Sequence, residues 1–174
     1  LEKIFIGPQT RFKKIVEERK NYKYKYLAII SGPEPQRSLL EDEIQNCFLK
    51  TNEHCAIING LINKKEISAE KITFYPHLET TAFRELLTKS EFVISRSGYS
   101  SIMDLYVLQK KVLFIPTPGQ TEQEYLAKYH QKTNSIYYQK QGRIDLKKAS
   151  FNFIQSKSKT KKKLLEAAFN NVFL

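Results

Sequence analysis

Short apolar runs alternate with amphipathic segments of helix length along most of this 174-residue chain. The runs are four to eight residues long, and the segments between them repeat their apolar residues at helical spacing. This alternation is typical of a parallel sheet whose strands are joined by crossover helices. We therefore expect an α/β fold with an open, doubly wound, mainly parallel sheet, the Rossmann-like arrangement.

Six strands and at least four helices are expected. The strands cover residues 24–31, 54–60, 71–78, 92–95, 111–116 and 135–139. The helices cover residues 36–50, 80–88, 100–108 and 121–131, and two more follow near the C-terminus. The chain shows no internal repeat and no low-complexity linker.

The formal net charge of +11 indicates an anionic partner, which is a nucleotide, a nucleic acid or an acidic membrane surface. Much of the excess lies in residues 11–26 and 157–163, and such runs are usually solvated faces. No strand carries a run of basic and aromatic residues on a single face, as RNA-binding sheets require. We therefore expect no specific nucleic-acid partner.

Hydropathy and cysteine usage favour a cytoplasmic protein. No apolar run approaches the roughly 20 residues that span a bilayer. The chain opens with neither a signal-peptide pattern nor a methionine, which indicates a piece of a longer protein. Cys47 and Cys55 are not spaced as metal ligands, so we expect two buried structural thiols in a reducing compartment.

Four polar loops follow the expected strands. In doubly wound sheets, ligands bind beyond the carboxyl ends of the strands, near the point where the strand order reverses. This rule selects residues 32–37, 76–79, 95–101 and 117–123. All four loops are rich in residues that make polar contacts, so we expect the binding site there.

The stretch VISRSGYSSIMDL, residues 93–105, passes from a strand directly into a helix. Gly98 allows a backbone conformation that other residues resist, and it allows close approach of a ligand. Ser100 or Ser101 is expected to cap the helix, so that the first free N–H groups face a phosphate. The alternative is a capped helix after a tight turn. The Rossmann glycine fingerprint and the phosphate-binding loop are both absent.

Further polar side chains lie beyond this turn. Asp104 stands one helical turn after Ser100, where its carboxylate suits two ribose hydroxyls, although it is equally an ordinary acid near a helix start. Gln120 and Gln123 carry amides that both donate and accept, which suits the hydroxyls of a sugar. The alternative is that Gln120 or Thr121 caps a helix.

The stretch from Lys71 to Ala127 resembles the C-terminal domain of family 28 glycosyltransferases, which have the GT-B fold. The resemblance rests on KITFYPHL, on EFVISRSGYSSIMDLYVLQKKVLFIP and on TPGQTEQEYLA. It implies a nucleotide-sugar donor-binding domain over residues 13–156. Residues 1–12 are then an interdomain connection, and residues 157–174 a basic amphipathic helix.

The resemblance also implies a role for each matched residue. The donor-binding set is Gly32, Arg37, His77, Leu78, Ser97, Gly98, Tyr99, Ser100, Ser101, Asp104, Gln120 and Gln123. Within it, Ser97, Gly98 and Ser100 meet the diphosphate, and Asp104 meets the ribose. The two glutamines meet the sugar, and the backbone at residues 77–78 meets the base.

Two positions depart from the family pattern. Asp104 stands where the family usually has the longer glutamate. The first loop, SGPEPQR, replaces a glycine-rich turn, and its two prolines remove two N–H donors. We expect Arg37 to supply a phosphate contact instead, although an arginine on the helix surface is the equal alternative.

The function implied is transfer of a hexosyl group from a nucleotide sugar, of which a UDP-sugar is favoured, to an acceptor hydroxyl. No metal, cofactor or catalytic residue is expected in this chain. The acceptor-binding domain is its missing partner, so the chain alone is expected to bind donor but to transfer poorly. A peripheral membrane contact is compatible with the basic surface. The alternatives are a sugar-nucleotide hydrolase or epimerase using Glu34 or Glu122, and a noncatalytic partner subunit.

Overall fold

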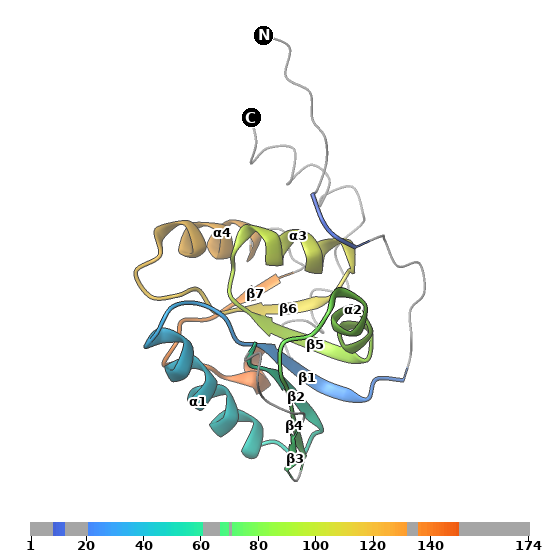
Figure 1. Ribbon diagram of the computed structural model, residues 1–174. Helices are drawn as coiled ribbons and strands as arrows, with labels where there is room; N and C mark the ends of the chain where they lie inside the picture. Colours follow the sequence, from blue (N-terminus) through green and yellow to red (C-terminus); the bar gives the residue numbers. More distant parts are fainter. Residues whose placement is uncertain (1–8, 13–20, 61–66, 70, 132–135, 150–174) are drawn as a thin grey trace.

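The computed structural model describes residues 9–12, 21–60, 67–69, 71–131 and 136–149. Within them, seven strands form one sheet in the order β3-β4-β2-β1-β5-β6-β7 (Figure 1). The strands are β1 (Tyr24–Ile29), β2 (Cys55–Ile58), β3 (Ile67–Ala69), β4 (Ile72–Tyr75), β5 (Ser90–Ser95), β6 (Lys111–Phe114) and β7 (Ile136–Tyr138). The helices are α1 (Gln36–Leu49), α2 (Thr80–Thr88), α3 (Tyr99–Val107) and α4 (Thr121–Gln131).

The sheet is wound in two directions from β1. The chain moves outward through β2 to β4, and then returns past β1 to β5, β6 and β7. All neighbouring pairs are parallel except β3 and β4. The doubly wound, mainly parallel sheet expected from the sequence is confirmed.

Strand β3 was not expected. It pairs antiparallel with β4 through the register Ile67↔Phe74 to Ala69↔Ile72, and it forms one edge of the sheet. Three residues are too few to produce a recognisable hydrophobic period. Only its pairing with β4, a tertiary fact, distinguishes this stretch from a loop.

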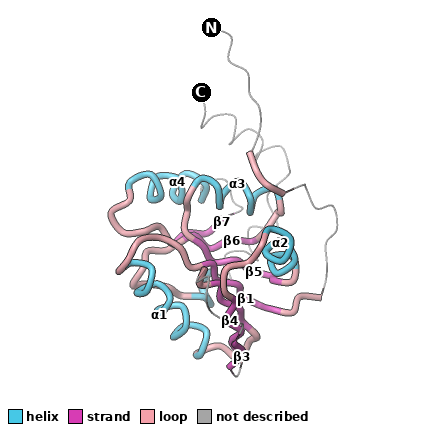
Figure 2. Tube along the Cα trace, in the orientation of Figure 1, coloured by secondary structure: helices cyan, strands magenta, loops and turns pink. Residues whose placement is uncertain are grey.

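Helices cover both faces of the sheet (Figure 2). Apolar residues of α2, α3 and α4 pack on one face, with Leu27, Val93 and Val112 from the strands. Helix α1 and the turn at residues 146–149 pack on the other face, where Tyr26 is among the strand residues. Because both faces are buried, the central strands read as continuous apolar runs.

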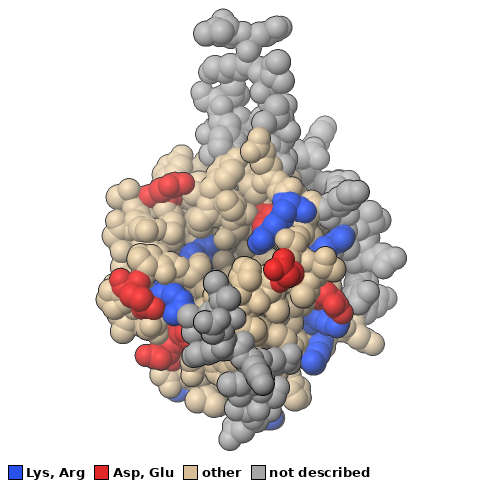
Figure 3. Space-filling view, in the orientation of Figure 1, with Lys and Arg blue, Asp and Glu red and all other residues tan. Residues whose placement is uncertain are grey.

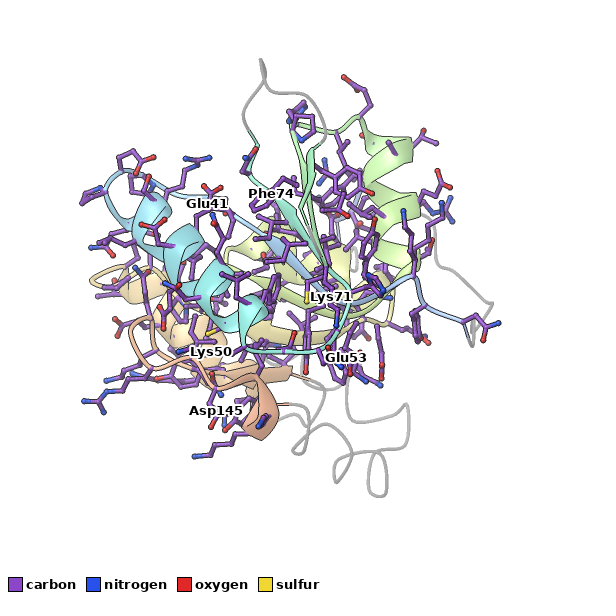
Figure 4. The ribbon with its side chains drawn as sticks, turned by 90° about the horizontal axis from the view of Figure 1, so that it is seen from below. Glu41, Lys50, Glu53, Lys71, Phe74 and Asp145 are labelled. Carbon is purple, nitrogen blue, oxygen red and sulfur yellow. The ribbon has the colours of Figure 1, made fainter. Side chains whose placement is uncertain are left out.

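The segment after β7 is fastened to α1. The Glu43 carboxylate accepts the backbone N–H of Gly142 at 2.8 Å and of Ile144 at 3.1 Å. Asp145, labelled in Figure 4, accepts the N–H of Lys148 at 2.9 Å and so caps a short helical turn at residues 146–149. The remainder of the two helices expected at this end, including residues 157–174, lies outside the described residues.

Charge is dispersed over the described surface. On the face seen in Figure 3, acidic and basic side chains are interspersed. Glu91, for example, pairs with Lys25 at 2.8 Å and with Lys111 at 2.7 Å. The basic residues 13–20 and 157–163 lie outside the described residues. No helix in the described part of the chain is long and apolar enough to span a membrane.

Candidate functional site

Strands β1 and β5 lie side by side at the point where the strand order reverses. Their register pairs Leu27 with Val93 and Ala28 with Ile94, so the two strands end at the same level. The loops that follow them, residues 30–35 and 96–98, therefore meet at the carboxyl edge of the sheet. This is the position at which doubly wound sheets bind ligands.

The second of these loops leads directly into α3, and Gly98 is its N-cap with φ −71° and ψ 149°. These angles are open to any residue, so the expectation of an unusual conformation at Gly98 was wrong. A Cβ added at Gly98 would meet no atom within 4 Å, so what glycine provides is space.

The expected serine cap is also wrong. Ser100 and Ser101 lie inside the first turn of α3, and no side chain caps this helix. The first intrahelical bond is donated by the N–H of Ile102 to the carbonyl of Gly98 at 3.0 Å. The amides before it in the first turn point along the helix axis toward the carboxyl edge, where the helix field favours an anion.

Ser97 does not present its side chain to a ligand. It is fully buried, and its hydroxyl donates to the backbone carbonyl of Gln123 at 2.7 Å. The Gln123 side chain in turn accepts the N–H of Thr117 at 2.9 Å and donates to Gln120. The two glutamines expected at the sugar therefore support the loop between β6 and α4 and bind each other.

Asp104 is buried against the start of the chain. It is 8% exposed, and its two carboxylate oxygens accept from different residues. Thr10 Oγ1 donates to Oδ1 at 2.6 Å, and Arg11 Nε donates to Oδ2 at 3.0 Å. A carboxylate offers about four lone-pair positions, so two remain for the hydroxyls of a ribose.

Arg11 was missed by the sequence analysis. Its guanidinium lies over the rings of Phe12 and Phe83, at 5.1 and 4.9 Å from their centroids, while it pairs with Asp104. These contacts hold residues 10–12 against α2 and α3. No pattern in the sequence predicts a pair whose members are 93 positions apart.

Arg37, expected at a phosphate, is engaged elsewhere. It pairs with Glu34 at 3.1 Å and with Glu41 at 3.8 Å, and it donates to the carbonyl of Asn59 beyond β2. Figure 4 shows Glu41 on the flank of α1 that faces β4. Glu34 also accepts the N–H of Ser38 at 3.2 Å, so a carboxylate already occupies the start of α1. The Arg37 side chain is only 16% exposed and joins the start of α1 to the end of β2, so the alternative of an arginine on the helix surface does not describe it either.

The remaining expected residues lie at the same edge of the sheet. Gly32 has φ +113°, a conformation that favours glycine. His77 is exposed and Leu78 is half-buried, in the loop between β4 and α2. Tyr99 is 37% exposed at the start of α3.

Neither cysteine is suited to nucleophilic chemistry. Burial raises the pKa of the Cys55 thiol to about 11, and it also raises the pKa of Cys47. Both therefore stay protonated at neutral pH. Among the described residues, no group of three or more His, Cys, Asp or Glu side chains is arranged to hold a metal ion.

Two solved structures show which class of fold this is. The crystal structure of Acinetobacter baumannii MurG aligns with a TM-score of 0.54 at 11% identity, over 84% of this chain and 44% of that one. The structure of the glycotransferase of kitacinnamycin also aligns with a TM-score of 0.54, at 8% identity, over 95% of this chain and 42% of that one. The chain thus shares its Rossmann-like fold with less than half of each of these two structures.

The sequence comparisons identify the family. Residues 27–170 match the glycosyltransferase family 28 C-terminal domain, and the chain belongs to this family. A curated relative from Sulfurihydrogenibium sp. is 29% identical over 166 residues, which are 91% of this chain and 44% of the relative. That relative is named UDP-N-acetylglucosamine–N-acetylmuramyl-(pentapeptide) pyrophosphoryl-undecaprenol N-acetylglucosamine transferase. The chain spans less than half the length of these relatives.

Proposed function

We propose that this chain is the donor-binding half of an inverting glycosyltransferase that takes a hexosyl group from a UDP-sugar. The observation that carries the proposal is the start of α3. It has no side-chain cap, it opens at the reversal of strand order, and the Asp104 carboxylate lies on the same helix. Membership of the family supplies the reaction class, and the name of the curated relative favours uridine as the nucleoside.

In this proposal the diphosphate lies at the first turn of α3. The amides of residues 99–101 donate to it, and the space above Gly98 allows its close approach. Asp104 accepts the ribose hydroxyls. The loops at residues 77–78 and 120–123 lie around the base and the sugar. The start of α1 is less suited to the diphosphate than the start of α3, because the Glu34 carboxylate accepts the N–H of Ser38 there.

The chemical step is a direct displacement at the anomeric carbon by an acceptor hydroxyl. The bond between the sugar and the diphosphate breaks, and the helix field and amide donors stabilise the departing charge. This role needs neither a metal nor a nucleophile from this chain. The base that takes the acceptor proton belongs to the acceptor-binding half, so the chain alone binds donor without efficient transfer. We propose that the full protein lies in the cytoplasm or at the membrane that bounds the cytoplasm.

Calorimetric titration of the chain with UDP, UDP-N-acetylglucosamine, GDP and dTDP tests the proposal. We expect selective binding of the uridine nucleotides, and at least about tenfold weaker binding by Asp104→Asn, because two charge-assisted hydrogen bonds become neutral. Asp42→Asn is the matched control, since Asp42 is an exposed residue on α1. Absence of binding by the folded wild-type chain would contradict the proposal, as would equal affinities of both variants.

A further inference from the structure

Arg96 is a buried cation at the centre of the carboxyl edge. It directly precedes the turn at residues 97–101, it is 3% exposed, and it makes no salt bridge in the described part of the chain. Burial lowers the pKa of its guanidinium to about 10, so it remains charged at neutral pH. A buried charge costs free energy unless hydrogen bonds replace its hydration.

Four backbone carbonyls, two at the loop after β1 and two after β6, supply those bonds. The guanidinium donates to Ser31 at 3.4 Å and to Gln36 at 2.8 Å, on either side of the first loop. It donates to Ile115 and to Pro116, each at 3.1 Å, where the chain leaves β6. One planar group therefore joins the loop after β1 and the loop after β6 to the turn after β5.

Some buried polar atoms near Arg96 make no hydrogen bond within the described fold. Within the described residues, three buried side-chain atoms lack a hydrogen-bond partner: Ser95 Oγ, Thr117 Oγ1 and Gln141 Oε1. All three follow or end strands at this edge, and a Cβ at Gly32 would lie 3.7 Å from Thr117 Oγ1 and 3.8 Å from Arg96 Nε. A buried polar atom costs free energy unless a hydrogen-bond partner reaches it, so these three atoms mark a polar layer at this edge.

We propose that Arg96 is a positioning residue, which holds the loops at residues 31–36 and 115–123 in register with the start of α3 so that a nucleoside diphosphate meets all of them at once. This inference rests on the proposed function and deepens it. Arg96 itself donates to backbone carbonyls and makes no contact with the donor. It acts through the residues whose loops it joins.

The test compares Arg96→Lys with core variants that lower stability elsewhere. Lysine keeps the charge, but a single ammonium cannot bridge carbonyls on opposite sides. Phe48→Leu and Phe48→Ala serve as controls, because Phe48 is buried near the end of α1, far along that helix from the carboxyl edge. Binding of UDP and of uridine is measured well below the melting temperature of every variant, and amide hydrogen exchange is measured without ligand.

We expect Arg96→Lys to weaken UDP binding at least about tenfold, since small displacements of a binding group carry such costs. Uridine binding should change much less, so the preference for UDP over uridine falls. A Phe48 variant whose melting temperature falls as much as that of Arg96→Lys should bind UDP and uridine as the wild type does. Exchange should rise in residues 31–36 and 115–123 and stay unchanged in β2 and β4.

Two results would overturn the inference. One is UDP binding by Arg96→Lys within twofold of the wild type. The other is a rise of exchange spread evenly over the sheet, which would make Arg96 a general stabilising residue. If the wild-type chain binds no nucleotide, the proposed function fails, and the exchange pattern alone then decides whether Arg96 joins the loops.

Discussion

Asp104 receives both of its side-chain hydrogen bonds from the beginning of the chain, 93 and 94 positions away. Arg11 is half exposed, and exposed ion pairs contribute about 0.2–1 kcal/mol. Its stacking on Phe12 and Phe83 restricts the side chain before it pairs. Residues 10–12 are thus attached to the same carboxylate that we propose for ribose binding.

A double-mutant cycle with Arg11→Gln and Asp104→Asn measures this attachment. We expect a coupling of about 0.5–1 kcal/mol in the free energy of unfolding, which urea denaturation determines. Lys128→Gln and Glu124→Gln form a control cycle across a looser pair, 3.9 Å apart and exposed on both sides, and should show less coupling. Equal coupling in the two cycles would mean that the Arg11 pair adds nothing beyond an ordinary surface pair.

His130 provides a prediction for pH. It is 2% exposed near the end of α4, and burial lowers its pKa to about 4 from an ordinary value of 6.5. Between these values the unfolded chain binds more protons than the folded chain. The free energy of unfolding therefore falls as the pH falls from 6.5 to 4, by about 3 kcal/mol from this residue.

Urea denaturation at several pH values measures this effect. His130→Gln removes the titrating group, so its stability should decline much less than that of the wild type over this interval. His54→Gln, at an exposed position, should keep the full decline. If His130→Gln declines as steeply as the wild type, carboxylates account for the acid sensitivity and His130 does not.

At the scale of the elements, the two loops at the reversal of strand order use glycine for different reasons. Gly32 has φ +113°, so alanine there is strained by about 1–2 kcal/mol. Gly98 has an ordinary φ and open space beside it, so alanine there should leave stability unchanged within about 0.5 kcal/mol. The added methyl group at Gly98 instead occupies the space that we propose for the diphosphate.

Thermal unfolding and UDP titration of the two variants separate these roles. Gly32→Ala should lower the melting temperature. Gly98→Ala should retain it and bind UDP more weakly than the wild type. Unchanged UDP affinity in Gly98→Ala would place the diphosphate away from the first turn of α3.

Elements with a strong local pattern were predicted well. The helices over residues 80–88 and 121–131 have the expected bounds, because apolar spacing and flanking polar residues mark them. The expected strand over residues 24–31 is shorter, since β1 ends at Ile29. Apolar residues continue into the loop beyond the last residue that is paired in the sheet. Hydropathy does not show where the backbone pairing ends. The three-residue strand β3 was not predicted, because only its pairing with β4 defines it.

At the scale of the whole molecule, nucleotide binding should stabilise the entire sheet. The proposed site joins loops from both directions of winding, so a bound nucleotide opposes the unfolding of either half. UDP at 100 times its dissociation constant should raise the free energy of unfolding by about 2.7 kcal/mol. Urea denaturation with and without UDP measures this shift, and Asp104→Asn at the same UDP concentration should show a smaller one. Stabilisation of that variant equal to that of the wild type would locate the nucleotide elsewhere.

The sequence by itself determined the chain order of six of the seven described strands and of helices α1 to α4, the four loops at the carboxyl edge and the turn that opens α3. These features follow from local periodicity and from the rule that parallel strands end at one edge, and neither depends on distant contacts. Only the tertiary structure decided that Thr10 and Arg11 hold Asp104, that Arg37 donates to the carbonyl of Asn59, and that Arg96 joins three loops. These side chains are polar, and their partners lie on other elements. The positions of those partners exist only once the sheet has formed.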